Sequence, residues 1–125
     1  MKKTILVVED DPSLVRLYQM TLKESYEILV AYNGQEALDQ VNAHRPDLIV
    51  MDVMMPMMDG LEALSRLKEN PETTTIPVIL LTAKVQHKDV LEGYQTGADY
   101  YITKPFTSRE LLNGISLCLG NGKAA

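Results

Sequence analysis

Four segments of the sequence place polar side chains at the ends of apolar runs, and together these side chains could do phosphate chemistry. The runs end on Glu9-Asp10-Asp11, Asp52, Thr82 and Lys104-Pro105. Carboxylates brought together repel one another unless a cation intervenes, and carboxylate oxygens with retained waters suit Mg²⁺ better than Zn²⁺. A dication, an ammonium group and a hydroxyl around one carboxylate could neutralise the oxygens of a phosphoryl group. These residue types therefore indicate phosphate chemistry that depends on Mg²⁺.

The same residues can act together only if the chain forms a parallel sheet. Unbroken apolar runs at residues 5–8, 48–51 and 78–81 are typical of strands buried on both faces. Residues 26–31 and 100–103 form weaker runs that suit edge strands. Ligands of open parallel sheets bind beyond the carboxyl ends of the strands. We therefore expect the polar residues to meet at one edge of the sheet.

Amphipathic stretches between the apolar runs predict helices. In the first, the apolar face comprises Leu14, Tyr18, Thr21 and Leu22. The predicted caps are Asp11 with Pro12 at the first helical position, Asn33, Asp59, and Thr107 with Glu110 as a capping box. A weaker helix is predicted over residues 88–96, and Gly114 is expected to cost the last helix about 1 kcal/mol relative to alanine. Alternating strands and helices imply a parallel sheet wrapped by helices.

Composition and charge limit the classes of function. The 125 residues suit one domain, which we expect over residues 1–120, followed by a flexible tail at 121–125. A net charge of −5 disfavours nucleic acid and anionic membrane surfaces as ligands. No apolar run approaches the roughly 20 residues needed to cross a bilayer. The single cysteine, Cys118, favours a reducing compartment, the cytoplasm, and with His44 and His87 it gives no zinc-ligand spacing.

Taken together, the polar segments resemble the receiver domain of bacterial two-component response regulators over essentially the whole chain. The matching segments are residues 5–11, residues 52–60, Leu81-Thr82-Ala83 and Lys104-Pro105-Phe106. The resemblance implies a flavodoxin-like, doubly wound, five-stranded parallel sheet of order 2-1-3-4-5 with helices on both faces. It implies a phosphorylation-dependent signalling switch and not an enzyme with an outside substrate. A sensor histidine kinase or histidine phosphotransfer protein would donate the phosphoryl group, and the domain would promote its own phosphorylation and dephosphorylation.

The resemblance also implies roles for the acidic residues. Asp52 is the expected phosphoacceptor, whose carboxylate becomes an acyl phosphate. Asp10, Asp52 and the backbone carbonyl of Met54 are the expected Mg²⁺ ligands, and Glu9 is expected to act through water. Asp11 is expected mainly to cap the first helix.

Three further residues are implied to respond to the phosphoryl group. The hydroxyl of Thr82 is expected to bind a phosphoryl oxygen, beside a small Ala83 that leaves room for it. Lys104, joined to Pro105 by a cis bond, is expected to pair with the acceptor and then with the phosphoryl group. Tyr101 matches an aromatic switch whose ring turns inward when Thr82 moves, although an exposed strand tyrosine fits the residue almost as well.

Other side chains near the expected acceptor lie at positions where receiver domains vary. Met54 and Lys84 are expected to overhang the phosphoryl group. The apolar Met54 could shield the acyl phosphate from water, whereas Lys84 could bind it or orient the attacking water, so the sequence does not give the sign of their net effect on hydrolysis. The methionines of this segment suit either loop packing or a pliable contact patch, and packing is the favoured interpretation: Met54, Met55, Met57 and Met58.

The last third of the chain bears on assembly and output. It is similar to receivers that dimerise through their final strand and helices. However, Tyr100 replaces the second Asp usual in that subgroup, and Asn113-Gly114 replaces the expected Ala-Arg. These changes remove charges that would join the two copies, so we expect a monomer or a weak, phosphorylation-dependent dimer that regulates a partner or an output domain.

Three other functions fit parts of the pattern. A flavin carrier would need a Ser/Thr/Gly-rich loop after the first strand, where Glu9-Asp10-Asp11 would repel the FMN phosphate. A Mg²⁺-dependent phosphatase would carry Asp-x-Asp after the first strand, whereas the acceptor candidate follows the third. A degenerate receiver used as a scaffold is disfavoured because every chemical position is filled. The sequence is compatible with a free-standing regulator and with one receiver of a longer protein.

Overall fold

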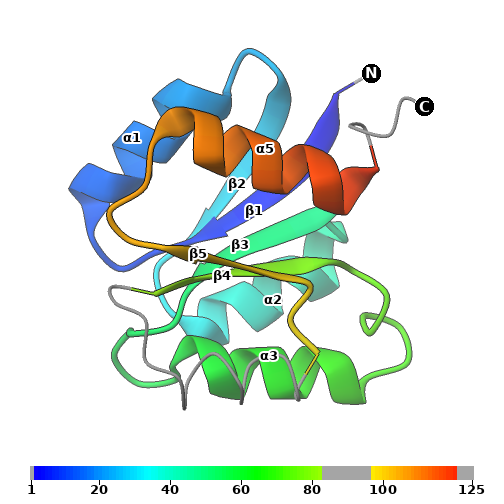
Figure 1. The fold of residues 1–125 in the computed structure, drawn as a ribbon. Coiled ribbons are helices and arrows are strands. Elements are labelled where there is room, and N and C mark those ends of the chain that lie inside the picture. Colours follow the sequence, from blue (N-terminus) through cyan, green and yellow to red (C-terminus); the bar gives the residue numbers. More distant parts are fainter. Residues whose placement is uncertain (1, 83–96, 121–125) are drawn as a thin grey trace.

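A parallel sheet forms the centre of the molecule (Figure 1). The computed structural model describes residues 2–82 and 97–120. The sheet has the order β2-β1-β3-β4-β5, and every neighbouring pair of strands is parallel. The strands are β1 (Lys3–Val8), β2 (Tyr26–Ala31), β3 (Leu48–Asp52), β4 (Val78–Thr82) and β5 (Tyr100–Thr103). The predicted strand order and both predicted edge strands are therefore confirmed.

Helices cover both faces of this sheet, with α1 and α5 on one face and α2 and α3 on the other (Figure 1). They are α1 (Pro12–Leu22), α2 (Gly34–His44), α3 (Gly60–Glu69) and α5 (Ser108–Leu119). All the predicted caps are confirmed, including the capping box of Thr107 and Glu110. The helix predicted over residues 88–96 lies outside the described residues, as do Ala83 and Lys84. Within the described ranges, each helix is too short or too polar to cross a membrane.

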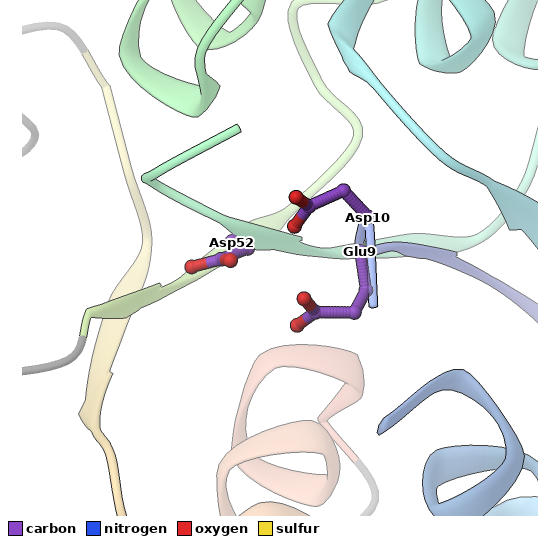
Figure 2. Close-up of side chains that lie close together, drawn as sticks. All are labelled: Glu9, Asp10 and Asp52. Carbon is purple, nitrogen blue, oxygen red and sulfur yellow. The ribbon is translucent and has the colours of Figure 1, made fainter. Parts of the chain in front are cut away.

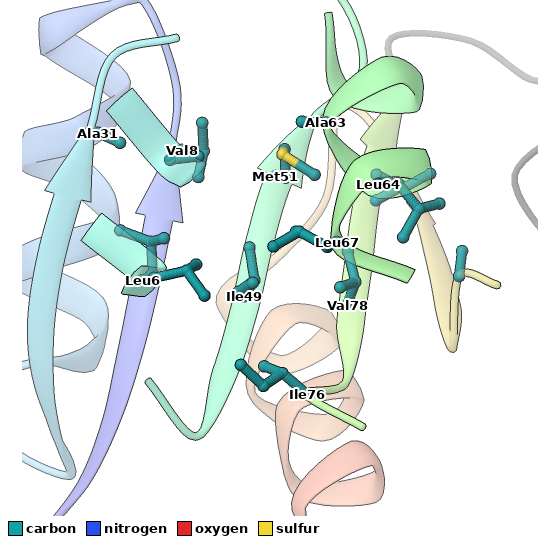
Figure 3. Packing of buried hydrophobic residues seen from close by; sticks show 14 of the residues in the cluster. Leu6, Val8, Ala31, Ile49, Met51, Ala63, Leu64, Leu67, Ile76 and Val78 are labelled. Atoms are coloured by element: carbon teal, nitrogen blue, oxygen red, sulfur yellow. The ribbon is translucent and has the colours of Figure 1, made fainter. Parts of the chain in front are cut away.

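Alternate residues of the central strands serve two separate cores. In β1, Ile5 and Val7 pack under α1 and α5, whereas Leu6 and Val8 pack under α2 and α3 (Figure 3). The same alternation runs through β3 and β4. Because both faces are covered, every side chain of β3 and β4 is buried, which explains their unbroken apolar runs.

The alternation continues at the strand ends and assigns two acids to one side of the sheet. Glu9 comes two residues after Val7, and Asp52 comes two residues after Val50. Both valines belong to the core under α1 and α5. Since β1 and β3 are neighbours in parallel register, the two carboxyl groups emerge at the same edge and on the same side.

Gly114 allows α5 to approach β5 closely. A Cβ atom at this position would lie 3.0 Å from Cε2 of Tyr100 and 3.2 Å from Cδ1 of Ile102. Both distances are shorter than ordinary van der Waals contacts, so alanine would disturb this packing. The close packing of α5 on β5 therefore acts against the helix-propensity cost of about 1 kcal/mol.

Candidate functional site

Three carboxylates meet at the carboxyl ends of β1 and β3 (Figure 2). Glu9, Asp10 and Asp52 each offer one oxygen, and these oxygens lie within 4.8 Å of one another. Glu9 and Asp52 are buried, with 1% and 6% of their surface exposed, whereas Asp10 is exposed. The acids at the two strand ends therefore lie close together, as the sequence predicted for a parallel sheet.

Lys104 brings a positive charge to both buried acids. Its Nζ lies 3.1 Å from Oε1 of Glu9 and 3.4 Å from Oδ2 of Asp52. The lysine follows β5, whose end is tied to β4 by a hydrogen bond from the Lys104 backbone N–H to the Thr82 carbonyl at 2.6 Å. The Lys104–Pro105 peptide bond is cis, as the resemblance implied. One ammonium group thus faces a cluster of three carboxylates, which leaves negative charge uncompensated among these four side chains.

Burial raises the pKa of both buried carboxyl groups. For Glu9, loss of solvent raises the pKa most and the charge of Asp52 raises it further, while Lys104 lowers it. For Asp52, loss of solvent again raises the pKa most, against Lys104 and a hydrogen bond from the Met54 backbone. Carboxylates whose charge is disfavoured in this way are stabilised by a nearby cation, and oxygen ligands suit a hard dication. The cluster therefore fits Mg²⁺.

Tyr18 of α1 completes the buried side of the site. Its hydroxyl donates a hydrogen bond to Oε1 of Glu9 at 3.2 Å, and its ring stacks on Phe106 with centroids 6.0 Å apart. Burial and the charge of Glu9 raise the pKa of the Tyr18 hydroxyl, which keeps it a donor. The sequence placed Tyr18 only on the apolar face of its helix. No spacing signal reveals the hydrogen bond, because the contact depends on how α1 packs against β1.

Thr82 and Tyr101 occupy the neighbouring strands β4 and β5. Thr82 is the last residue of β4, is 4% exposed, and pairs in register with Thr103, which precedes Lys104. Tyr101 is half-buried and packs against the core under α2 and α3. Tyr101 is thus neither a fully exposed strand tyrosine nor a fully buried one.

The loop between β3 and α3 holds Asp52 through close backbone contacts. The N–H of Gly60 donates to the Val53 carbonyl at 2.9 Å. A Cβ atom at Gly60 would overlap the carbonyl oxygen of Asp52 and would lie 2.9 Å from Cα of Val53. Only glycine lets the start of α3 approach the end of β3 this closely.

The methionines of the same loop fall into two groups. Met58 is buried and Met55 is half-buried, and both pack against the core under α2 and α3. Met54 and Met57 are 69% and 82% exposed. The expectation of loop packing is therefore wrong for Met54 and Met57, whose side chains the loop directs outward, away from that core.

A family match over most of the chain identifies the protein class. The model of the response regulator receiver domain matches residues 5–116. The chain belongs to the response regulator receiver domain family. This receiver domain is 44% identical over 112 residues to the alkaline phosphatase synthesis transcriptional regulatory protein PhoP of Bacillus subtilis, covering 89% of the chain and 46% of that protein. It therefore spans about half the length of the curated relatives it matches.

Solved structures show the same fold. A putative response regulator from Chloroflexus aurantiacus superposes with a TM-score of 0.91 at 32% identity, covering 96% of this receiver domain and 99% of that chain. The receiver domain of a sensor histidine kinase from Pseudomonas aeruginosa gives a TM-score of 0.88 at 28% identity, with the same coverage of 96% and 99%. That structure holds a magnesium ion in its active-site cleft. Receiver domains act in phosphorylation-dependent two-component signalling and bind Mg²⁺ at an acidic site.

Proposed function

We propose that this receiver domain accepts a phosphoryl group on Asp52 and signals through its last strand and helices. The supporting observation is the surroundings of one carboxylate. Asp52 ends a buried strand, has the Lys104 ammonium 3.4 Å from its Oδ2, and shares a cluster with two further acids. Charge of both signs around a single acceptor suits the transfer of a phosphoryl group.

The proposed reaction is an in-line transfer from a phosphohistidine of the donor protein. A carboxylate oxygen of Asp52 attacks phosphorus, and the new O–P bond forms as the P–N bond breaks. The imidazole nitrogen keeps the bonding electron pair and, with a proton from solvent, leaves as neutral histidine. The product is an acyl phosphate on Asp52, which water later converts to inorganic phosphate and the original carboxylate. The domain thereby promotes its own phosphorylation and dephosphorylation without turning over an outside substrate.

Asp10, Asp52 and the backbone carbonyl of Met54 would hold Mg²⁺. When bound, the ion would neutralise negative charge on the acceptor and on the phosphoryl oxygens. Glu9 suits contact through water, because its Oε1 already faces Tyr18 and Lys104 and its Oε2 accepts the Asp11 backbone N–H at 3.3 Å.

The switch would use the residues at the ends of β4 and β5. Phosphorylation adds a charge of about −1.5 to −2, which the Thr82 hydroxyl and the Lys104 ammonium would bind. As Thr82 moves toward the phosphoryl group, the half-buried ring of Tyr101 would turn inward. An almost complete switch needs about 5.5 kcal/mol of differential stabilisation, so we expect phosphorylation to shift the population only in part.

A sensor histidine kinase or a histidine phosphotransfer protein would donate the phosphoryl group in the cytoplasm, and a partner or an output domain would read it. We expect a monomer or a weak dimer after phosphorylation. The Tyr100 ring supports this expectation. It packs against Gly114 of α5 in its own chain, and it brings no charge that could pair with a second copy.

Incubation with acetyl phosphate and Mg²⁺ is expected to add one phosphoryl group to the intact protein, because the cluster and Lys104 supply the charges the transfer needs. Intact-mass measurement follows the addition, and hydroxylamine should release the group because it cleaves acyl phosphates. Chelation of Mg²⁺ by EDTA before the donor is added should prevent the gain. An unchanged mass with Mg²⁺, or an equal gain with EDTA, would contradict the proposed function.

A further inference from the structure

The hydroxyl of Tyr18 has no step in the proposed transfer, yet it is bound to the most buried acid of the site. It donates to Oε1 of Glu9 at 3.2 Å. Nζ of Lys104 contacts the same oxygen at 3.1 Å. One Glu9 oxygen therefore accepts from both a neutral hydroxyl and the Lys104 ammonium group, and the same ammonium group also contacts Asp52.

The surroundings of Tyr18 fix the direction of its hydroxyl. The side chain is 1% exposed and belongs to the core under α1 and α5. Its ring stacks on Phe106 at an angle of 17° between the planes. A ring that is buried and stacked in this way has little room to move, so its hydroxyl stays directed at Glu9.

A fixed hydroxyl has two effects on a cation that enters the cluster. The positive end of the O–H dipole points at the carboxylates and makes the potential of the cluster less negative. The hydrogen bond also engages a Glu9 oxygen that could otherwise accept from water bound to the ion. Both effects oppose cation binding.

We propose that Tyr18 is a positioning residue that weakens binding of divalent cations at the acidic cluster by donating to Glu9. The inference rests on the proposed function only in placing Mg²⁺ at this cluster, held by Asp10 and Asp52 with Glu9 acting through water. A weaker site keeps cation occupancy responsive to the Mg²⁺ concentration.

Tyr18→Phe is expected to bind Mg²⁺ and Mn²⁺ about threefold to tenfold more tightly than the parent protein, because hydrogen bonds to charged groups are among the stronger ones. Phenylalanine retains the ring, its stacking on Phe106 and the filling of the core. The dissociation constant of Mn²⁺ is measured by electron paramagnetic resonance on the full chain, and Mg²⁺ is measured by competition. No phosphoryl donor is present, so the readout does not depend on transfer.

Tyr26→Phe provides the matched control. Tyr26 is 8% exposed and lies in the same core, but it begins β2 and so sits at the opposite end of the sheet from the acidic cluster. This variant should bind Mn²⁺ as the parent does. In a Glu9→Gln background, Tyr18→Phe should no longer tighten binding, because the hydroxyl acts through the Glu9 carboxylate.

The outcomes separate this inference from the proposed function. If the parent protein binds neither ion, the assigned Mg²⁺ site is wrong and the inference falls with it. If the parent binds Mn²⁺ but Tyr18→Phe binds with the same or lower affinity, the inference alone is overturned. Equal tightening in Tyr26→Phe, or tightening that persists in the Glu9→Gln background, would also overturn it.

Discussion

Replacing Lys104 by methionine is expected to lower the free energy of unfolding of the metal-free protein by about 3–5 kcal/mol, the usual cost of leaving a buried charge unpaired. Nζ of Lys104 lies 3.1 Å from Glu9 and 3.4 Å from Asp52, and both acids are buried. Methionine keeps an apolar side chain of comparable length but leaves the two carboxylates without their shared cation. Urea unfolding in EDTA measures the loss, and Mg²⁺ should restore part of it because a dication also compensates the acids.

Arg66→Met is the control for the Lys104 substitution. Nη2 of Arg66 lies 3.1 Å from Glu62, the same separation as in the Lys104–Glu9 pair, but both side chains are about half exposed. Exposed pairs contribute roughly 0–1 kcal/mol, so this variant should unfold close to the parent. A similar loss of unfolding free energy in both variants would contradict the account, because it would show that the stabilisation by Lys104 does not depend on the burial of Glu9 and Asp52.

Asp52→Asn is expected to have the opposite effect on stability and to abolish phosphorylation. In metal-free buffer it should raise the free energy of unfolding by about 1–2 kcal/mol, as relief of strain at a functional site commonly does. The substitution removes one buried negative charge, and the Lys104–Glu9 pair at 3.1 Å remains. Urea unfolding with and without Mg²⁺ measures the change in stability, and Mg²⁺ should stabilise the parent more than the variant, because the variant lacks one of the proposed ligands. Intact mass after incubation with acetyl phosphate and Mg²⁺ measures the loss of phosphorylation.

Asp10→Asn is the comparison for this second substitution. Asp10 belongs to the same cluster but is exposed, so solvent already screens its charge. Its removal should change metal-free stability by less than the removal of Asp52. A loss of stability in Asp52→Asn would mean that Lys104 already compensates the acceptor fully, and the need for a dication would lose its physical basis.

Much of the fold was predictable from the sequence because its signals are local. The unbroken run before Asp52 marks a strand covered on both faces, and Asp11 and Thr107 mark helix starts by side-chain hydrogen bonds to nearby backbone. The convergence of Glu9 and Asp52 followed from one global rule, that parallel strands end at the same edge.

What the sequence did not predict depends on packing between elements. The predicted apolar face of α1 is confirmed at Tyr18 and Leu22, but the prediction missed Val15, which is buried, and it included Thr21, which is only half-buried. The rotation of α1 and its distance from the sheet decide whether the Tyr18 hydroxyl reaches Glu9. Neither quantity has a sequence signature, because a buried tyrosine at this spacing satisfies the amphipathic pattern with or without a polar partner.

The most direct test of the phosphoacceptor is chemical mapping of the modified residue. Borohydride reduces an acyl phosphate of aspartate to homoserine, which remains in the chain and can be located by peptide mass spectrometry. After treatment with acetyl phosphate and Mg²⁺, we expect homoserine in place of Asp52 and at no other aspartate. Homoserine in place of Asp10, or its absence from a protein that has gained a phosphoryl group, would contradict the assignment of Asp52.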